Sequence, residues 1–199
     1  MADDQIDNIS DPQRVRAMTH PTRLRLMDYL GTVPDATATE CADHVGESVA
    51  SCSFHLRMLA KYGFIERAPS RGREKPWRLI SRARSARPDF EDRDSVQAVA
   101  AFSLTHLEHQ VGLMRDWLQY QVHHEDPEWA GVTTQTSALM WMTREELSEV
   151  ATQLNSIADR FDGRWEDPSK RPAGSRPVRM YAMTFPDQEH GERDDVEAK

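Results

Sequence analysis

The feature that most constrains the fold of this chain is the segment at residues 48–80. Its first part predicts a helix, because Ser48 is a suitable N-terminal cap, Gly63 is a terminator, and apolar residues between them fall at steps of three and four positions. Its second part predicts two short strands, FIERA and PWRLI, around the cationic, glycine-containing loop SRGREK. We therefore expect a helix that is followed directly by a β-hairpin with a basic tip.

Three shorter helices are expected before this segment. The first follows the Ser-Asp-Pro sequence at residues 10–12, and the second runs from Pro21 to a stop at Gly31. The third opens with Thr37 and Glu40, which have the spacing of a capping box. Three helices, a serine-rich capped helix and a basic hairpin predict a mainly α (α+β) fold, the winged helix-turn-helix.

The order and spacing of several residues resemble a known family. After HPTRLRLMDYL comes the pattern S-x-x-x-x-S-x-H-L-x-x-L-x-x-x-G-F-I, which begins at Ser48 and ends at Ile65. This pattern resembles the ArsR-type family of bacterial transcriptional regulators over about residues 11–85. The resemblance implies a homodimeric DNA-binding regulator, in most relatives a repressor, that binds a palindromic operator with half-sites about one helical turn apart.

A helix that enters the major groove needs small, polar residues at its N-terminal end, because that end approaches the base edges. The recognition helix predicted at residues 48–62 meets this condition, and Arg57 and Lys61 farther along suit phosphate oxygens. Cations of the wing at residues 69–75 can reach the flanking backbone or the minor groove. The expected DNA-binding residues are therefore Ser48, Ala50, Ser51, Ser53, Phe54, His55, Arg57, Lys61, Arg71, Arg73 and Lys75.

Two of these residues have more than one interpretation. Phe54 is expected on the surface, where it could contact a thymine methyl group or pack against a neighbouring residue. His55 matches the characteristic histidine of the family, and we favour a bond to phosphate or within the protein over a base contact. Both residues are expected to be available to DNA.

The charge distribution suits a polyanionic partner for the first half of the chain only. The 199 residues carry a formal net charge of −8, but residues 11–88 hold 14 Lys and Arg against 8 Asp and Glu, a net charge of +6. Residues 89–199 hold 11 against 22, a net charge of −11. We expect the basic half to face double-stranded DNA and the acidic half to stay away from it.

The spacing Cys52-x-x-His55 could instead place two ligands on one helical face. Cys52 falls in line with Leu56 and Leu59, however, and this favours a small buried hydrophobe over a metal ligand. Cys41 also falls on an apolar face, whereas a reactive thiol is partly exposed and near positive charge. Thiol redox sensing by the two cysteines stays open as an alternative.

Metal sensing, which many members of the family perform, is a second alternative. Arsenic- and cadmium-type members carry a Cys-x-Cys pair where this chain has Thr37 and Thr39. His106 and His109 supply half of a zinc-type site, but Ser95 stands where the other half would begin. We expect neither a metal nor a cofactor. Nucleophile-elbow, phosphate-loop, dinucleotide and HExxH motifs are missing too, so we do not expect an enzyme.

The second half of the chain predicts a dimerisation helix after a linker at residues 81–93. This helix, about 28 residues long, runs from residue 94 or 95 to about residue 123 and carries two apolar faces. One face is expected to pack on the chain's own domain and the other on a second copy. The expected dimer interface comprises Val96, Ala100, Leu107, Met114 and Leu118.

Residues 125–199 contain one predicted helix. Thr143 and Glu146 form a capping box that opens a helix to about Phe161. VTTQTSALMWM could be a strand or a short helix, and VRMYAMTF could be a strand. The methionine and aromatic side chains of this region favour either a small core that seals the dimer or a site for a small-molecule effector or a protein partner.

These elements predict four regions along the chain. They are a disordered N-terminus at 1–9, the winged helix-turn-helix domain at 10–88, a helical dimerisation region at 94–165, and a linker, a strand and a disordered tail at 166–199. The sequence MADDQIDN has none of the features of a secretory signal, and no apolar run is long enough to span a membrane. We expect a cytoplasmic protein that has no membrane partner.

Overall fold

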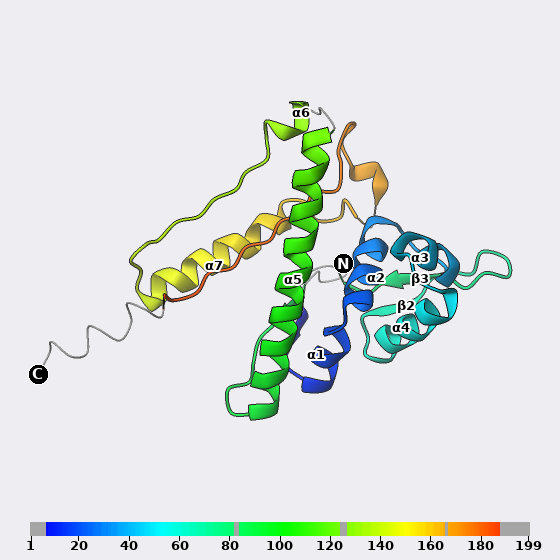
Figure 1. Ribbon diagram of the computed structural model, residues 1–199, viewed down its shortest axis with the longest axis horizontal. Helices are drawn as coiled ribbons and strands as arrows, with labels where there is room; N and C mark the ends of the chain where they lie inside the picture. Colours follow the sequence, from blue (N-terminus) through cyan, green and yellow to red (C-terminus); the bar gives the residue numbers. More distant parts are fainter. Residues whose placement is uncertain (1–6, 82–83, 124–126, 166, 188–199) are drawn as a thin grey trace, which may run out of the picture. The chain divides into compact units, whose positions relative to one another are not determined.

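The computed structural model of the chain describes residues 7–81, 84–123, 127–165 and 167–187 (Figure 1). The chain divides into two compact units, Met1–Val132 and Thr133–Lys199. The first unit contains the helices α1 (Pro12–Met18), α2 (Pro21–Thr32), α3 (Ala38–Val45), α4 (Val49–Lys61), α5 (Arg93–His123) and α6 (Pro127–Ala130), and the strands β1 (Asp7–Ile9), β2 (Ile65–Arg67), β3 (Trp77–Leu79) and β4 (Arg84–Ala86). The second contains α7 (Arg144–Asp159) and the short 3-10 helix η1 (Pro168–Lys170).

Local hydrogen bonds explain where the predicted helices begin. The side chains of Asp11 and Ser48 accept hydrogen bonds, of 2.9 and 3.1 Å, from backbone N–H groups in the first turns of α1 and α4. At α3, Thr37 and Glu40 form both hydrogen bonds of the predicted capping box. The predicted starts of these three helices are confirmed.

The end of α2 differs from the prediction. The helix continues through Gly31 to Thr32, and Val33 then adopts an extended conformation. A Cβ atom at Gly31 would lie 3.7 Å from the side chain of Leu79 on β3, which is ordinary van der Waals contact. Gly31 is therefore an interior helical residue that faces the hairpin. The helix ends one residue later, where the chain becomes extended toward the backbone bridge between Ala36 and Trp77.

Helices α2, α3 and α4 pack on one another, and α2 and α4 contact the hairpin of β2 and β3 (Figure 1). The hairpin is antiparallel, with Ile65 opposite Leu79. Residues with at most 1% exposure fill the space between these elements: Leu26, Leu30, Cys41, Cys52, Leu56, Leu59, Phe64 and Ile65. Burial of a large apolar side chain contributes about 1.5–3 kcal/mol, so this core dominates the stability of the domain. The predicted winged helix-turn-helix fold is confirmed.

Two segments that were expected to be irregular form a small sheet. β1 pairs in parallel with β4, and Ile9 lies opposite Ala86. Ile9 is 1% exposed, so its burial holds the N-terminal segment against the domain. The prediction of a disordered N-terminus is therefore wrong for residues 7–9, and the linker prediction is wrong for residues 84–86. Residues 1–6 and 82–83 lie outside the described residues.

The predicted long helix is confirmed as α5, which has 31 residues and a length of about 46 Å. It packs against α1 and α2: Ser95, Ala98 and Val99 are buried in its first turns, and His109 contacts Asp28 of α2 farther along. This packing joins α5 to the winged domain, so the boundary between compact units falls after α5 and not in the linker before it. Among the described helices, none combines the length and the apolar character that a membrane span needs.

The face of α5 that was assigned to dimerisation is largely solvent-exposed. Leu107, Met114 and Leu118 are 38%, 45% and 56% exposed. Ala100 is exposed as well, and Val96 is half-buried. The other apolar face lies toward the chain's own domain where it begins, because Val99 is buried and Phe102 half-buried. Farther along this second face, Trp117 and Tyr120 are 38% and 45% exposed, so the two faces of the helix differ only over its first turns.

The second unit is built around α7, which starts with the predicted capping box of Thr143 and Glu146. The two segments for which strands were considered, residues 132–142 and 178–185, form neither strand nor helix. Their β-propensity is not sufficient, because a strand needs a hydrogen-bonded neighbour. No described residue from 133 to 187 is fully buried. The predicted disordered tail falls mostly on residues 188–199, which lie outside the described residues.

Ser95 provides a test of how α5 is attached. Its fully buried hydroxyl donates a hydrogen bond to the Ser10 carbonyl (2.7 Å) and accepts one from the Asp89 N–H (3.0 Å). Ser95→Ala leaves both backbone groups unpaired, so we expect a loss of about 1–3 kcal/mol in the free energy of unfolding, measured with urea. Ser103→Ala, at an exposed position of the same helix, should change it by less than about 0.5 kcal/mol. Equal effects of the two variants would contradict this attachment.

Candidate nucleic-acid interface

Helix α4 has two chemically different faces. On its inner face, Cys52, Leu56 and Leu59 have 0% exposure. On its outer side, the predicted contact residues Ser48, Ala50, Arg57 and Lys61 are exposed, and Ser51 and Ser53 are half-buried. Phe54 is 52% exposed, as predicted. The outer side therefore begins with small, polar residues and ends with cations.

The two cysteines lie inside the domain. Cys41 and Cys52 both have 0% exposure and form no disulfide. Burial raises the pKa of the Cys41 thiol to about 12, with smaller contributions from Cys52 and Glu40. Burial is also the main cause of the raised pKa of Cys52, followed by the charge of Glu47. Since thiolates are the reactive form, this environment disfavours redox sensing, and the prediction that Cys52 is a buried hydrophobe is confirmed.

His55 does not lie where a DNA-contacting residue is expected. Its side chain is only 9% exposed, and its ring packs on that of His20 with 4.4 Å between centroids. Phe54 lies edge-on to it at 5.3 Å. The position explains the burial, because His55 immediately precedes Leu56 and follows Cys52 by nearly one turn, at the edge of the inner face. The expectation that His55 is available to DNA is therefore corrected.

The second histidine of this pair was not among the predicted site residues. His20 precedes α2, and its Nδ1 accepts a hydrogen bond from the Thr22 N–H (3.2 Å). Burial is the first cause of the lowered pKa of both rings. His20 and Arg23 lower the pKa of His55 further, and Arg23 and Arg25 lower that of His20, while Glu47 acts in the opposite direction on both. Both histidines are therefore poised to remain neutral near pH 7.

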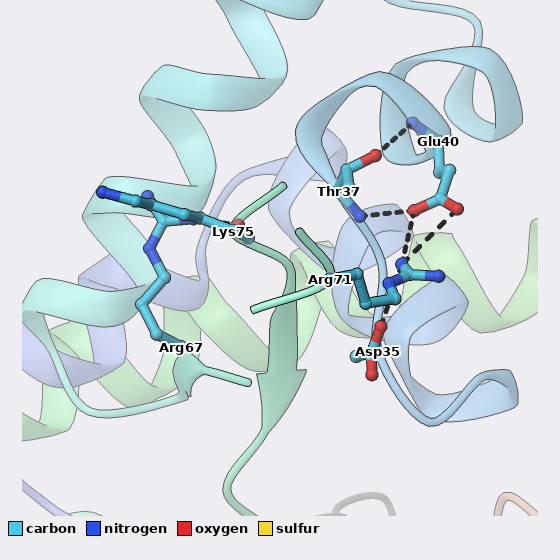
Figure 2. Close-up of polar contacts among 6 residues, drawn as sticks. All are labelled: Asp35, Thr37, Glu40, Arg67, Arg71 and Lys75. Atoms are coloured by element: carbon cyan, nitrogen blue, oxygen red, sulfur yellow. Dashed lines mark hydrogen bonds and ion pairs between the residues drawn. The ribbon is translucent and has the colours of Figure 1, made fainter. Parts of the chain in front are cut away.

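The predicted wing cations differ in their surroundings. Arg73 and Lys75 are exposed. Arg71, in contrast, forms ion pairs with Asp35 (2.9 Å) and Glu40 (3.1 Å), as Figure 2 shows. The expectation that Arg71 is free to reach DNA is thus not met in this structure. A sequence pattern could not have indicated this pairing, since the partners are more than 30 positions away.

Several other arginines of the basic half are also engaged within the protein. Arg25 donates to the Val45 carbonyl (2.7 Å) and pairs with Glu47 (2.9 Å). Arg78 pairs with Glu66 across the hairpin (2.7 Å). Arg67 lies over the Trp77 ring at 3.5 Å. The count of 14 Lys and Arg in residues 11–88 therefore overstates the number of cations that this half offers to a polyanion.

Comparison with protein families identifies the type of domain to which these helices belong. Residues 18–68 match the helix-turn-helix domain family. The match covers about a quarter of the chain and runs from the end of α1 to the residue after β2. Together with the hairpin, it makes this part of the chain a winged helix-turn-helix domain, the fold of DNA-binding transcription regulators. No curated protein matches the chain.

Solved structures of winged helix-turn-helix proteins resemble the chain distantly. The homodimeric DNA-binding domain of Mb0332 from Mycobacterium bovis, a possible ArsR-family transcriptional regulator, is 21% identical and covers 48% of this chain and 78% of its own, with a TM-score of 0.32. FabT from Streptococcus pneumoniae, solved in complex with DNA, is 15% identical and covers 70% of this chain and 73% of its own, with a TM-score of 0.28. Likenesses at this level carry no weight for function, so the fold assignment depends on the helices and hairpin themselves.

The two histidines of the half-site for zinc are engaged separately. His109 lies 2.7 Å from the Asp28 carboxylate on α2, and His106 contacts Gln110 at 2.9 Å. In the part of the chain that the structure describes, no group of three or more His, Cys, Asp or Glu side chains is arranged to hold a metal ion. His124, Glu125 and Asp126 lie outside that part.

The pair of His20 and His55 makes the stability of the winged helix-turn-helix domain sensitive to acid. Because their folded-state pKa values lie below the ordinary value, the unfolded chain takes up protons first as the pH falls. The contribution of the pair is complete above about pH 6.5 and is lost as the pH falls below it. We expect Tm to fall between pH 7.5 and 5.5 and to fall less in His55→Gln. His44→Gln, at an exposed position of α3, should retain the full fall; identical pH profiles for all three proteins would contradict this assignment.

Proposed function

We propose that this chain is a sequence-specific DNA-binding transcriptional regulator that binds double-stranded operator DNA as a homodimer. The observation that carries the proposal is the two-sided character of α4. Its inner face belongs to the core, and its outer side presents small, polar residues followed by cations. The winged helix-turn-helix fold and the basic first half of the chain support the same function.

In the proposed complex, α4 lies in the major groove with its N-terminal end toward the bases. Ser48, Ala50 and Ser51 allow a close approach there, because none of them carries a bulky side chain. Ser53 follows them on the same half of the helix. The exposed Phe54 ring is suited to an apolar contact with a thymine methyl group.

The affinity of the proposed complex comes mainly from cations at its edges. Arg57 and Lys61 lie on the later turns of α4, where the helix passes the phosphate backbone. Arg73 and Lys75 project from the hairpin tip toward the flanking backbone or minor groove. None of these four cations has an ion pair among the described residues, so their charges are available to phosphates.

The proposed dimer forms through the exposed apolar face of α5. This face comprises Val96, Ala100, Leu107, Met114 and Leu118, of which Val96 is half-buried and the other four are exposed. Apolar residues at this spacing favour packing against an equivalent helix. A two-fold axis along the interface would relate two copies of α4, which suits a palindromic operator. Repression in the cytoplasm is the proposed outcome, as the resemblance to the ArsR-type family implies.

An effector-responsive sensor is the alternative, and the second unit favours it. Exposed methionine and aromatic side chains, among them Met140, Trp141, Met180 and Phe185, are 59%, 83%, 55% and 71% exposed. Such side chains adapt to apolar ligands and to protein partners. A small molecule or protein that binds this unit would then change operator affinity. The two functions are compatible, since the sensor would still act through the winged domain.

Arg57 tests the DNA-binding proposal. The probe is a duplex that the protein selects from a randomised DNA library, and its binding is measured by fluorescence anisotropy over about 50–200 mM salt. Arg57→Ala should weaken binding to all sequences and reduce the slope of log K against log salt by about 0.9, because one phosphate contact is lost. Arg144→Ala removes an exposed arginine from the second unit and should leave the slope unchanged. An unchanged slope in Arg57→Ala would remove this residue from the contacts, and failure to select any duplex would overturn the function.

Leu118 tests the dimer. Leu118→Glu places a charge on the proposed interface, so sedimentation equilibrium should show a shift from dimer to monomer at the same protein concentration. Gln119→Glu adds the same charge at the neighbouring exposed position of α5 and should leave the dimer intact. A dimer that survives Leu118→Glu, or a wild-type chain that is monomeric, would rule out this interface.

A further inference from the structure

The side chain of Arg71 joins the tip of the hairpin to the start of α3. Its Nη2 atom lies 2.9 Å from Asp35 Oδ1 and 3.1 Å from Glu40 Oε2 (Figure 2). Asp35 precedes α3, and Glu40 lies in the first turn of that helix. The arginine therefore links the wing to the segment that opens α3, which itself packs against α4.

One of the two carboxylates, that of Glu40, is also fixed by the hydrogen bonds of a capping box. Glu40 Oε2 accepts a hydrogen bond from the Thr37 N–H (2.6 Å), and the Thr37 hydroxyl accepts one from the Glu40 N–H (3.2 Å). This capping box lowers the pKa of Glu40, and the charge of Arg71 lowers it further. The same carboxylate thus caps α3 and holds the wing.

The rest of the hairpin explains why this link matters. At its base, the backbones of Ala36 and Trp77 form two hydrogen bonds, of 2.9 and 2.7 Å. At its tip, Arg71 and Glu74 form a second backbone pair at 3.1 Å in both directions, and Gly72 takes a left-handed φ of 64° between them. These backbone hydrogen bonds join residues within the tip and do not involve the helices. Among the described residues 69–75, the polar side-chain contacts with the segment that opens α3 come from Arg71.

The ion pairs themselves are partly exposed. The side chains of Arg71, Asp35 and Glu40 are 46%, 25% and 45% exposed. Exposed ion pairs contribute little to the stability of a fold. A contribution to stability therefore does not explain why these three side chains lie together. Two carboxylates also outweigh the charge of one guanidinium, which disfavours the approach of a phosphate to Arg71.

We propose that Arg71 is a wing-positioning residue, which through Asp35 and Glu40 fixes the hairpin tip relative to α3 and α4, and that Arg73 and Lys75 make the phosphate contacts of the wing. This inference depends on the proposed DNA binding for its second part only. A wing of fixed orientation lets two cations meet the duplex without an additional loss of conformational entropy. Arg71 thereby acts on DNA affinity through its neighbours.

Hydrogen exchange of the full-length protein without DNA tests the positioning. Arg71→Ala should speed amide exchange in residues 69–75 and leave α4 unchanged. The double variant Asp35→Asn/Glu40→Gln should do the same, and the glutamine preserves the capping box. Arg73→Ala, which removes an unpaired cation of the tip, is the matched control and should not change exchange there. Unchanged exchange at 69–75 in Arg71→Ala would overturn the proposal, even if the protein did not bind DNA.

Salt-dependent binding of the selected duplex tests the role in DNA recognition. Arg71→Ala should weaken binding about tenfold with an unchanged slope of log K against log salt, whereas Arg73→Ala should reduce the slope by about 0.9. Asp35→Asn/Glu40→Gln should also weaken binding, and Arg71→Ala should have no further effect in that background. If Arg71 contacts phosphate itself, the double variant frees its charge and tightens binding. Tighter binding, or a reduced slope in Arg71→Ala, would overturn the proposal and leave DNA binding by α4 intact.

Discussion

The burial of one face of α4 is the interaction on which the rest of the winged domain depends. Cys52, Leu56 and Leu59 pack without exposure against the other helices and the hairpin. Successive helical residues point in directions about 100° apart, so burying this face also decides which residues face solvent. The small residues at the N-terminal end and the cations beyond them are exposed for that reason. The chemistry of the candidate interface is therefore a consequence of the packing of the core.

Electrostatic pairing then divides the cations of the domain into two groups. Arg25, Arg71 and Arg78 each pair with carboxylates of the same domain, and their charges are largely compensated at short range. Arg57 and Lys61 have no such partner among the described residues. At about 0.1 M salt, charges that lie more than about 10 Å from a phosphate are largely screened. The phosphate therefore interacts more strongly with the nearest uncompensated cations than with the net charge of the domain. The cations of the first group are engaged in contacts within the domain, and those of the second group are available to a ligand.

The two compact units differ in how much apolar surface they bury. The first has a continuous core, and α5 extends it only along its first turns. The later turns of α5 keep Leu107, Met114 and Leu118 exposed, and no described residue of the second unit is fully buried. Exposed apolar surface of this extent is unfavourable in water and is characteristic of interaction sites. Exposed apolar surface is therefore the feature that these parts of the chain share.

Much of the fold follows from neighbours along the sequence. The caps at Ser48 and Thr37, the apolar spacing of α4 and the alternation of the hairpin each depend on residues within a few positions, so the sequence by itself determined the winged helix-turn-helix and the outer side of α4. Tertiary structure alone decided three other features: the burial of Ile9 beside β4, the stacking of His55 on His20, and the pairing of Arg71 with Asp35 and Glu40. Their partners lie tens of residues apart, and no local pattern specifies which distant groups folding will bring into contact.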